Sequence, residues 1–133
     1  MKNELYELYK QCFPTSQLSK EIFLDVVDYD KSNIILAQEH CHIVGVSIVD
    51  KNVIRFMCVD PQMQNRGFGK ELLKRSEDAI LSDGYEEAII CKSDIVLDNK
   101  NVDELLTAEF FIKHGYEKHT DDLSIWRSKK LVN

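Results

Sequence analysis

The residues with the clearest chemistry lie in one short segment, Val59-Asp60-Pro61-Gln62-Met63-Gln64-Asn65-Arg66-Gly67-Phe68-Gly69-Lys70. Gly67 and Gly69 lack side chains at the start of a helical pattern, so a ligand can come close to the backbone. The first turn of a helix also leaves several amide N–H groups unpaired, at the positive end of the helix dipole. These features predict a site for a pyrophosphate, with Arg66 and Lys70 adding positive charge for peripheral phosphates.

The glycine spacing leaves a second interpretation open. It matches neither the GxGxxG pattern of dinucleotide-binding folds nor the GxxxxGK pattern of P-loops, so neither cofactor is implied. From the residues alone, two glycines before a helix are equally compatible with a tight turn that binds nothing. The choice depends on the elements that position this loop.

Hydrophobic periodicity predicts the element order αα-βββ-α-β-α-ββ. A first helix (2–12) ends before Pro14, and Ser16 or Ser19 caps a second one, whose apolar face is Ile22, Phe23, Val26 and Val27. Short connections between three β-branched runs predict an antiparallel meander. The later elements are predicted as a helix, a buried strand reached by a parallel crossover, a helix and two strands. The ranges after the second helix are 33–38, 42–49, 53–59, 67–81, 87–92, 102–114, 116–119 and 123–128. The pattern describes one α+β domain, residues 1–133, around a mixed sheet.

Composition and charge narrow the classes of function. The chain has 133 residues with a net charge of −6, 44% hydrophobic and 30% charged residues, which is typical of one soluble globular domain. The acidic balance argues against nucleic acid as a partner, because phosphate contacts need a basic surface. We expect no membrane span and no signal peptide, and hence a cytoplasmic protein, because no apolar run is long enough.

The cysteines and histidines predict no metal site. The four cysteines, Cys12, Cys41, Cys58 and Cys91, show no CxxC pairing and are expected to be reduced thiols. Although His40-Cys41-His42 contains zinc-type ligands, adjacent residues on a hairpin point to alternate faces and cannot easily close a tetrahedron. Cys58 and Cys91 lie in apolar strands, where the pKa of a thiol rises, so neither is a good nucleophile.

Two segments together resemble the GNAT superfamily of N-acetyltransferases. Gln64-Asn65-Arg66-Gly67-Phe68-Gly69 matches its Q/R-x-x-G-x-G/A signature, and Ala108-Glu109-Phe110-Phe111-Ile112-Lys113-His114-Gly115-Tyr116 is similar to its FYxKxGF segment. The element order resembles the GNAT fold along essentially the whole chain. The resemblance implies a mixed, mostly antiparallel sheet of six to seven strands, flanked by about four helices. It also implies a splay between the fourth and fifth family strands, here 53–59 and 87–92.

The resemblance implies acetyl-CoA as the acyl donor and places its contacts on this sequence. Main-chain groups of 57–59 would lie along the pantetheine arm, with an amide near Val59 holding the thioester carbonyl as an oxyanion donor. The amides from Gln64 to Lys70 would hold the pyrophosphate. The cofactor-binding residues implied are Met57, Cys58, Val59, Gln64, Asn65, Arg66, Gly67, Phe68, Gly69, Lys70, Phe111 and Lys113.

The sequence departs from the family at the proton donor. Many members carry a tyrosine as general acid where this chain has Phe111, so another group or solvent protonates the thiolate, or activity has been lost. The replacement candidates are Tyr116, His119, Ser93 and Asp94. No acid occupies Ile54 or Arg55, where some members place a glutamate base, which leaves Glu39 or the acidic second helix for a water-relayed role.

The acceptor is expected to be a small-molecule or peptide amine. In the family, the first two helices and the C-terminal strands build acceptor specificity. The acids around the second helix slightly favour a cationic acceptor, although a solvated helix face is the more common explanation for such a group: Glu21, Asp25, Asp28 and Asp30. The assembly is predicted to be a monomer or homodimer. The competing hypotheses are a non-catalytic acyl-CoA-binding or regulatory module on the same fold and a protein-interaction domain without cofactor.

Overall fold

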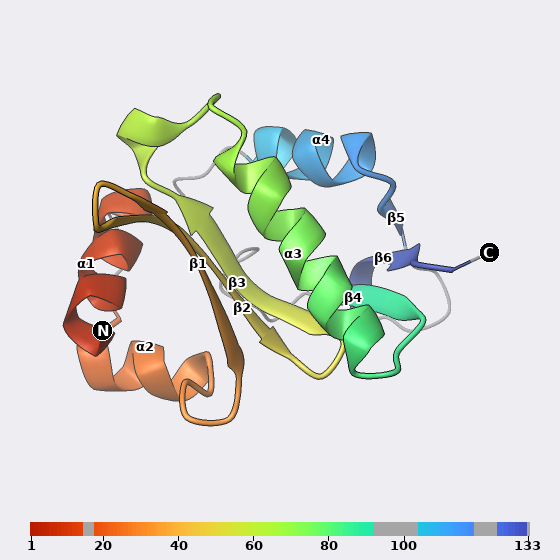
Figure 1. Ribbon diagram of the computed structural model, residues 1–133, viewed down its shortest axis with the longest axis horizontal. Coiled ribbons are helices and arrows are strands. Elements are labelled where there is room, and N and C mark those ends of the chain that lie inside the picture. Colours follow the sequence, from red (N-terminus) through yellow and green to blue (C-terminus); the bar gives the residue numbers. More distant parts are fainter. Residues whose placement is uncertain (15–17, 92–103, 119–124, 133) are drawn as a thin grey trace.

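The computed structural model of the chain describes residues 1–14, 18–91, 104–118 and 125–132, with the backbone alone for 104–108. The elements in chain order are α1 (Lys2–Cys12), α2 (Lys20–Val26), β1 (Asn33–Glu39), β2 (His42–Asp50), β3 (Val53–Val59), a 3₁₀ turn (Pro61–Met63), α3 (Phe68–Ser82), β4 (Glu87–Cys91), α4 (Glu104–Lys113), β5 (Glu117–Lys118) and β6 (Ile125–Lys130) (Figure 1). This order confirms the predicted one.

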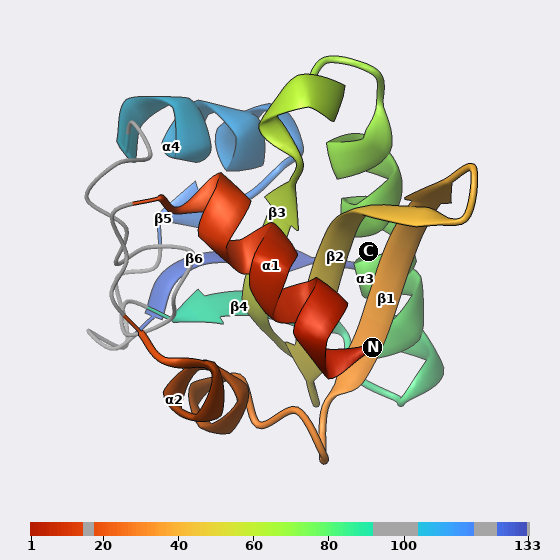
Figure 2. The same cartoon turned by 90° about the vertical axis from the view of Figure 1, so that its left-hand side faces the viewer.

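One six-stranded mixed sheet carries the fold, in the order β1-β2-β3-β4-β6-β5. The first three strands form the predicted antiparallel meander, and β4 joins β3 in parallel. Helices α1 and α2 cover one face of the sheet and α3 and α4 the other (Figures 1 and 2). The α+β class and the sheet expected from the resemblance are thereby confirmed.

Beneath α1 and α2 lies an aromatic core. Tyr9 stacks on Phe23 with ring centroids 4.3 Å apart, and Phe23 meets Phe56 of β3 edge-on at 5.3 Å. Ser19 caps α2, accepting a hydrogen bond from the main-chain N–H of Ile22 at 3.3 Å. One predicted core position is wrong, because Ile22 is 52% exposed. Successive helix residues are about 100° apart, so with Phe23 pointing inward its neighbour points to solvent.

At Arg55, the side chains of β3 switch from one face of the sheet to the other. Its register with β2 pairs Phe56 with Ile48 and Ile54 with Val49, so Arg55 is one extra residue on β3. A β-bulge of this kind bends the strand and sharpens its twist. Phe56 therefore belongs to the core beneath α1 and α2, whereas Ile54 joins the core beneath α3 and α4.

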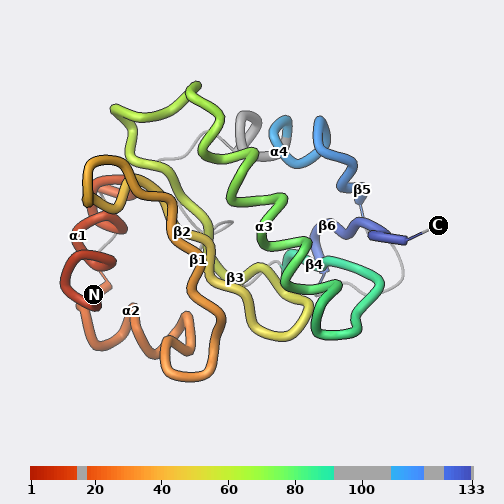
Figure 3. The backbone as a smooth tube through the Cα atoms, viewed as in Figure 1, coloured from red at the N-terminus to blue at the C-terminus, as the bar shows by residue number. Residues whose placement is uncertain are grey.

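Past the bulge, β3 leaves β4. The two strands share one register position, Val53 with Ile89, where the Ile89 N–H donates to the Asn52 carbonyl at 2.9 Å. Among the described strands, none pairs with this side of β3 beyond Val53, while β4 pairs with β6 along its length. The splay expected between 53–59 and 87–92 is therefore present. Figure 3 shows the backbone continuing from the end of β3 into the loop before α3.

Candidate active site

The loop between β3 and α3 has a defined path. Asp60 caps the 3₁₀ turn, its carboxylate accepting from the Gln62 N–H at 2.9 Å. Asn65 and Gly67 then take left-handed conformations, with φ of 66° and 88°. Gly67 is the N-cap of α3, and its carbonyl accepts the first helical bond, from the Glu71 N–H at 3.0 Å. A side chain at Gly67 would be strained, because L-residues rarely adopt this φ.

The main-chain N–H groups of this loop have no acceptor among the residues that the structure describes. From Gln64 to Lys70, none of them donates a hydrogen bond to another group in the described part of the chain. They lie at the positive end of α3, a helix of 15 residues. A Cβ placed on Gly67 would meet no atom within 4 Å, so the space before the helix is open. Unbonded N–H groups at the start of a helix, beside open space, are compatible with an anion-binding site.

Gly69 has a different surrounding from Gly67. A Cβ on Gly69 would lie 3.5 Å from the ring of Phe110 on α4 and 3.9 Å from Val59. The second glycine therefore allows α4 and the end of β3 to pack close to the first turn of α3. Phe110 lies beside the predicted Phe111 in the sequence, yet only the packing of α4 on α3 reveals its place at the loop.

The charged side chains of the loop are exposed. Arg66 forms an ion pair with Glu39 at 3.8 Å, and Lys70 extends from the first turn of α3 into solvent. Because the pair lies on the surface, it is worth at most about 1 kcal/mol, and Arg66 can exchange Glu39 for a phosphate. Glu39, a candidate for a water-relayed base, thus lies beside the loop.

The main chain of β3 presents alternate residues to the splay. The Asp60 N–H donates to the Val44 carbonyl at 2.8 Å, and Cys58 lies opposite Val46 on β2. Since main-chain groups on a strand alternate between its two sides, Met57 and Val59 direct theirs away from β2, toward the splay. Of the three residues expected along the pantetheine arm, Cys58 has its main chain committed to β2.

The Val59 carbonyl already has two donors. Cys12 Sγ at the end of α1 and Gln64 Nε2 in the loop each lie 3.3 Å from this oxygen. Beside it, a hollow of about 270 Å³ is lined by Gln11, Asp60, Pro61 and Gln62. Cys12 and Gln11 were absent from the predicted site, since a helix pattern does not show which strand its last turn will meet.

Phe111, which stands where many family members carry a tyrosine, lies in the core. Phe111 is 1% exposed, and its ring meets those of Tyr116 at 5.5 Å and Trp126 at 6.2 Å. Lys113, by contrast, is exposed at the last turn of α4. Phe111 therefore contributes packing beneath α4.

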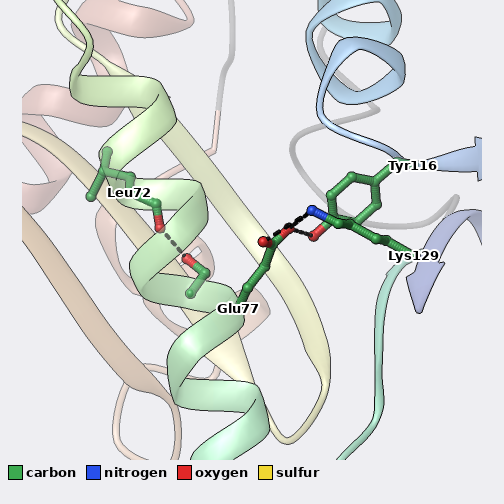
Figure 4. Close-up of polar contacts among 5 residues, drawn as sticks. Leu72, Glu77, Tyr116 and Lys129 are labelled. Atoms are coloured by element: carbon green, nitrogen blue, oxygen red, sulfur yellow. Dashed lines mark hydrogen bonds and ion pairs between the residues drawn. The ribbon is translucent and has the colours of Figure 1, made fainter. Parts of the chain in front are cut away.

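Tyr116, a candidate acid, is held in a polar cluster between α3 and β6 (Figure 4). Its hydroxyl donates to Glu77 Oε2 at 2.8 Å, and Lys129 Nζ lies 3.2 Å from the same carboxylate. Burial raises the pKa of Tyr116 far above its ordinary value, and the neighbouring carboxylate of Glu77 raises it further. This placement favours a structural role. The other candidates, His119, Ser93 and Asp94, lie outside the described residues.

His114 was not among the predicted residues. It packs edge-on against Phe110, with ring centroids 4.7 Å apart. Partial burial lowers its pKa, and the charge of Lys129 lowers it further, against an opposing effect of Glu77. Among the described residues, no contact places His114 at the splay.

The histidine–cysteine tripeptide lies at a hairpin tip. His40 and Cys41 have φ of 52° and 68° and are exposed. Across the described ranges, no three metal-ligating side chains gather at one point. In the same ranges, the helices are too short or too polar to cross a lipid bilayer.

Comparisons with known proteins agree with this geometry. The family model described as "Acetyltransferase (GNAT) domain" matches residues 2–123. The chain therefore belongs to the GNAT acetyltransferase family. A search of the curated proteins finds no match.

Solved structures share the fold at low sequence identity. An aminoglycoside 6′-N-acetyltransferase complexed with coenzyme A has a TM-score of 0.75 and 15% identity, over 99% of this chain and 91% of that one. The PaiA N-acetyltransferase from Thermoplasma acidophilum, in complex with coenzyme A, has a TM-score of 0.67 and 17% identity, over 97% and 92%. A GNAT family acetyltransferase from Elizabethkingia anophelis with acetyl-CoA bound has 0.67 and 16%, over 95% and 90%. The family and these neighbours together support acyl transfer from an acyl-CoA.

Proposed function

We propose that this protein is an N-acetyltransferase that moves an acetyl group from acetyl-CoA to a primary amine. The observation that carries the proposal combines two features of the described residues: the amides from Gln64 to Lys70 donate no hydrogen bond, and no strand pairs with the neighbouring edge of β3 beyond Val53. The free amides alone are compatible with a tight turn. Together, the amides and the edge of β3 offer an anion site and an extended main-chain edge, which suit the pyrophosphate and the amide-containing arm of one ligand.

Each part of the site has a proposed role. The amides of 64–70 hold the pyrophosphate, with Arg66 and Lys70 contributing charge, while Met57 and Val59 offer main-chain groups to the pantetheine arm. A main-chain N–H near Val59 holds the thioester carbonyl oxygen and stabilises the negative charge that develops there during attack. The bound coenzyme supplies an activated acyl group with a thiolate as leaving group.

The reaction is proposed to be direct attack in a ternary complex. Positioning contributes most of the rate, because the thiolate leaves without an obligatory acid. The amine loses its proton to water or to an exposed carboxylate before attack. We place the approach of the amine on the α1 side of β3, where the hollow lined by Gln11 and Asp60 opens beside Val59.

The acceptor is proposed to be a small-molecule or peptide amine, with a cationic one favoured. Glu21 and Asp25 on α2 are exposed, and the exposed Asp30 forms an ion pair with Lys2 at 3.6 Å. We further propose a cytoplasmic protein that acts as a monomer or homodimer.

Titration calorimetry with acetyl-CoA tests the binding part of the proposal. We expect a dissociation constant below the millimolar range and a single site. No heat and no thermal stabilisation at millimolar acetyl-CoA would remove the basis for the proposal, since a bound ligand stabilises the folded state by mass action.

A non-catalytic acyl-CoA-binding module is the second candidate, and the buried positions of Phe111 and Tyr116 favour it. Release of free thiol from acetyl-CoA, measured with a panel of polyamines, aminoglycosides and lysine peptides, separates the two. Turnover with any amine supports the enzyme. Tight binding with thiol release at the background rate for the whole panel supports the module.

A further inference from the structure

Arg127 on β6 has a guanidinium group without a hydrogen-bonding partner. In the described part of the chain, its Nε is the one buried side-chain nitrogen or oxygen that makes no hydrogen bond. The guanidinium instead packs on the ring of Trp126, whose centroid lies 4.8 Å from Arg127 Cζ. A buried donor left unpaired destabilises a fold, and the effect is larger for a charged group. Such an atom therefore calls for an explanation.

The two terminal nitrogens of the same guanidinium reach solvent. Neither forms a hydrogen bond or an ion pair with a described residue, and neither is among the buried atoms that lack a partner. Arg127 as a whole is accordingly half-buried. With Nε enclosed, a ligand can approach from the Nη1–Nη2 edge. This edge presents two parallel N–H donors, an arrangement that binds two oxygens of a phosphate or carboxylate.

A second cation without a partner stands opposite Arg127. Lys118 on β5 is its register partner in the antiparallel pair β5–β6, so the two side chains leave the same face of the sheet. Like charges at directly opposite positions repel each other. Lys129, two residues along β6, is neutralised by Glu77 at 3.2 Å (Figure 4). Among the described residues, no carboxylate does the same for Lys118 or Arg127.

The two cations lie apart from the loop before α3. Ile90, which pairs with Arg127 from β4, belongs to the core beneath α3 and α4, and this places both cations on that face of the sheet. In the sheet order, β4 separates β6 from β3, and β5 is the outermost strand. The positive charge is therefore concentrated at the sheet edge opposite β1.

We propose that Arg127 and Lys118, with Trp126 beside them, bind the phosphate group of a phosphate monoester. Two positive charges without a partner match a dianion, and a phosphate monoester carries about −1.5 to −2 charges near pH 7. The Nη1 and Nη2 groups donate to two phosphate oxygens, Lys118 contributes charge, and the ring of Trp126 supports the guanidinium. A carboxylate brings a single charge to the same donors and binds more weakly. The site is independent of acetyl transfer.

Tryptophan fluorescence tests the proposal, because Trp126 is the single tryptophan of the chain. The full chain is titrated with inorganic phosphate, with glycerol phosphate and with acetate, at an ionic strength held constant with sodium chloride. We expect a saturable change with both phosphates and a dissociation constant about fivefold weaker for acetate, the effect of one charge pair at about 4 Å in water. No saturable change, or equal affinity for phosphate and acetate, would overturn the proposal.

Variants locate the bound phosphate. Arg127→Met should abolish the fluorescence response, and Lys118→Gln should weaken phosphate about fivefold. Lys130→Gln is the matched control, since Lys130 is an exposed lysine of the same strand and should leave the response unchanged. If Arg127→Met does not fold, Lys118→Gln decides the matter, because Lys118 is exposed. Undiminished phosphate affinity in either variant would contradict the proposal.

Thermal melting gives a second measurement, because the loss of Arg127 also changes the surroundings of Trp126. Phosphate should raise the melting temperature of the unmodified protein more than that of Arg127→Met. An equal rise in both would show that phosphate acts elsewhere and would overturn the proposal. Calorimetry with acetyl-CoA reports separately on the proposed function. Arg127→Met should bind acetyl-CoA as the unmodified protein does, and a loss of that affinity would assign Arg127 to the coenzyme site instead.

Discussion

Substituting Gly67 by glutamate places a carboxylate at the N-cap of α3, in the loop that we propose binds the pyrophosphate. At about 5 Å from a bound phosphate, each pair of charges repels by about 1 kcal/mol in bulk water and about 3 kcal/mol at an effective dielectric constant of about 20. One such interaction corresponds to a dissociation constant weakened by about 5- to 200-fold. The pyrophosphate carries more than one charge, so this range is a lower bound.

The substitution also strains the backbone, and α3 itself supplies the matched control. Gly67 and Gly84 have φ of +88° and +92°, and a Cβ on either would meet no atom within 4 Å. Glutamate at each position should therefore lower the free energy of unfolding by a similar amount, about 1–2 kcal/mol. Gly84 lies past the C-terminal end of α3, on the far side from the loop.

The assay is acetyl-CoA calorimetry on both variants, with urea unfolding as the measure of stability. We expect Gly67→Glu to lose most of its affinity while Gly84→Glu binds as the unmodified protein does. Equal affinities in the two variants, with both folded, would refute the assignment of the pyrophosphate to these amides.

Four further predictions concern stability. Tyr116→Phe should lower the free energy of unfolding by about 1–2 kcal/mol, because Glu77 loses a buried donor, and leave thiol release unchanged; a loss of turnover at equal acetyl-CoA affinity would instead make Tyr116 the acid. Since the pKa of Tyr116 is raised in the folded state, stability should fall as pH rises above about 10, where the unfolded chain ionises first, and urea titrations of Tyr116→Phe should show a smaller fall. Cys41→Gly should raise the urea midpoint, by about 1 kcal/mol of unfolding free energy, because glycine adopts a φ of 68° without strain; no gain would show that the turn is relaxed already. Gly45→Ala should cost about 1–3 kcal/mol in urea unfolding, since its Cβ would lie 2.9 Å from Leu72 Cδ1, and an unchanged midpoint would mean that Leu72 moves freely.

Much of the architecture follows from local pattern. The runs 33–38, 42–49 and 53–59 predicted the meander to within a residue or two, because short polar connections leave strands few ways to pair. The start of α3 at Phe68 agrees with the prediction because the glycine and the first residues with helical hydrophobic spacing fall at the same place in the sequence. The C-terminal strand was predicted to end at Ser128, whereas β6 continues to Lys130, where apolar alternation gives way to lysines.

What the sequence did not show depends on contacts between distant elements. The extra residue at Arg55 becomes visible only in the register of β3 against β2. Likewise, the thiol of Cys12 on the Val59 carbonyl and the hydroxyl of Tyr116 on Glu77 join residues with no local pattern in common. Such contacts depend on how helices dock on the sheet, which periodicity leaves undetermined.

Among the described residues, strands β1–β3 and β4–β6 share one register position, Val53 with Ile89, although the hydrophobic core beneath α3 and α4 contains residues of both groups of strands. A ligand that separates β3 from β4 therefore breaks few main-chain hydrogen bonds. Deuterium uptake at the Ile89 amide would report directly on opening between β3 and β4. A slower uptake with acetyl-CoA than without it would show that the bound ligand holds the two strands together.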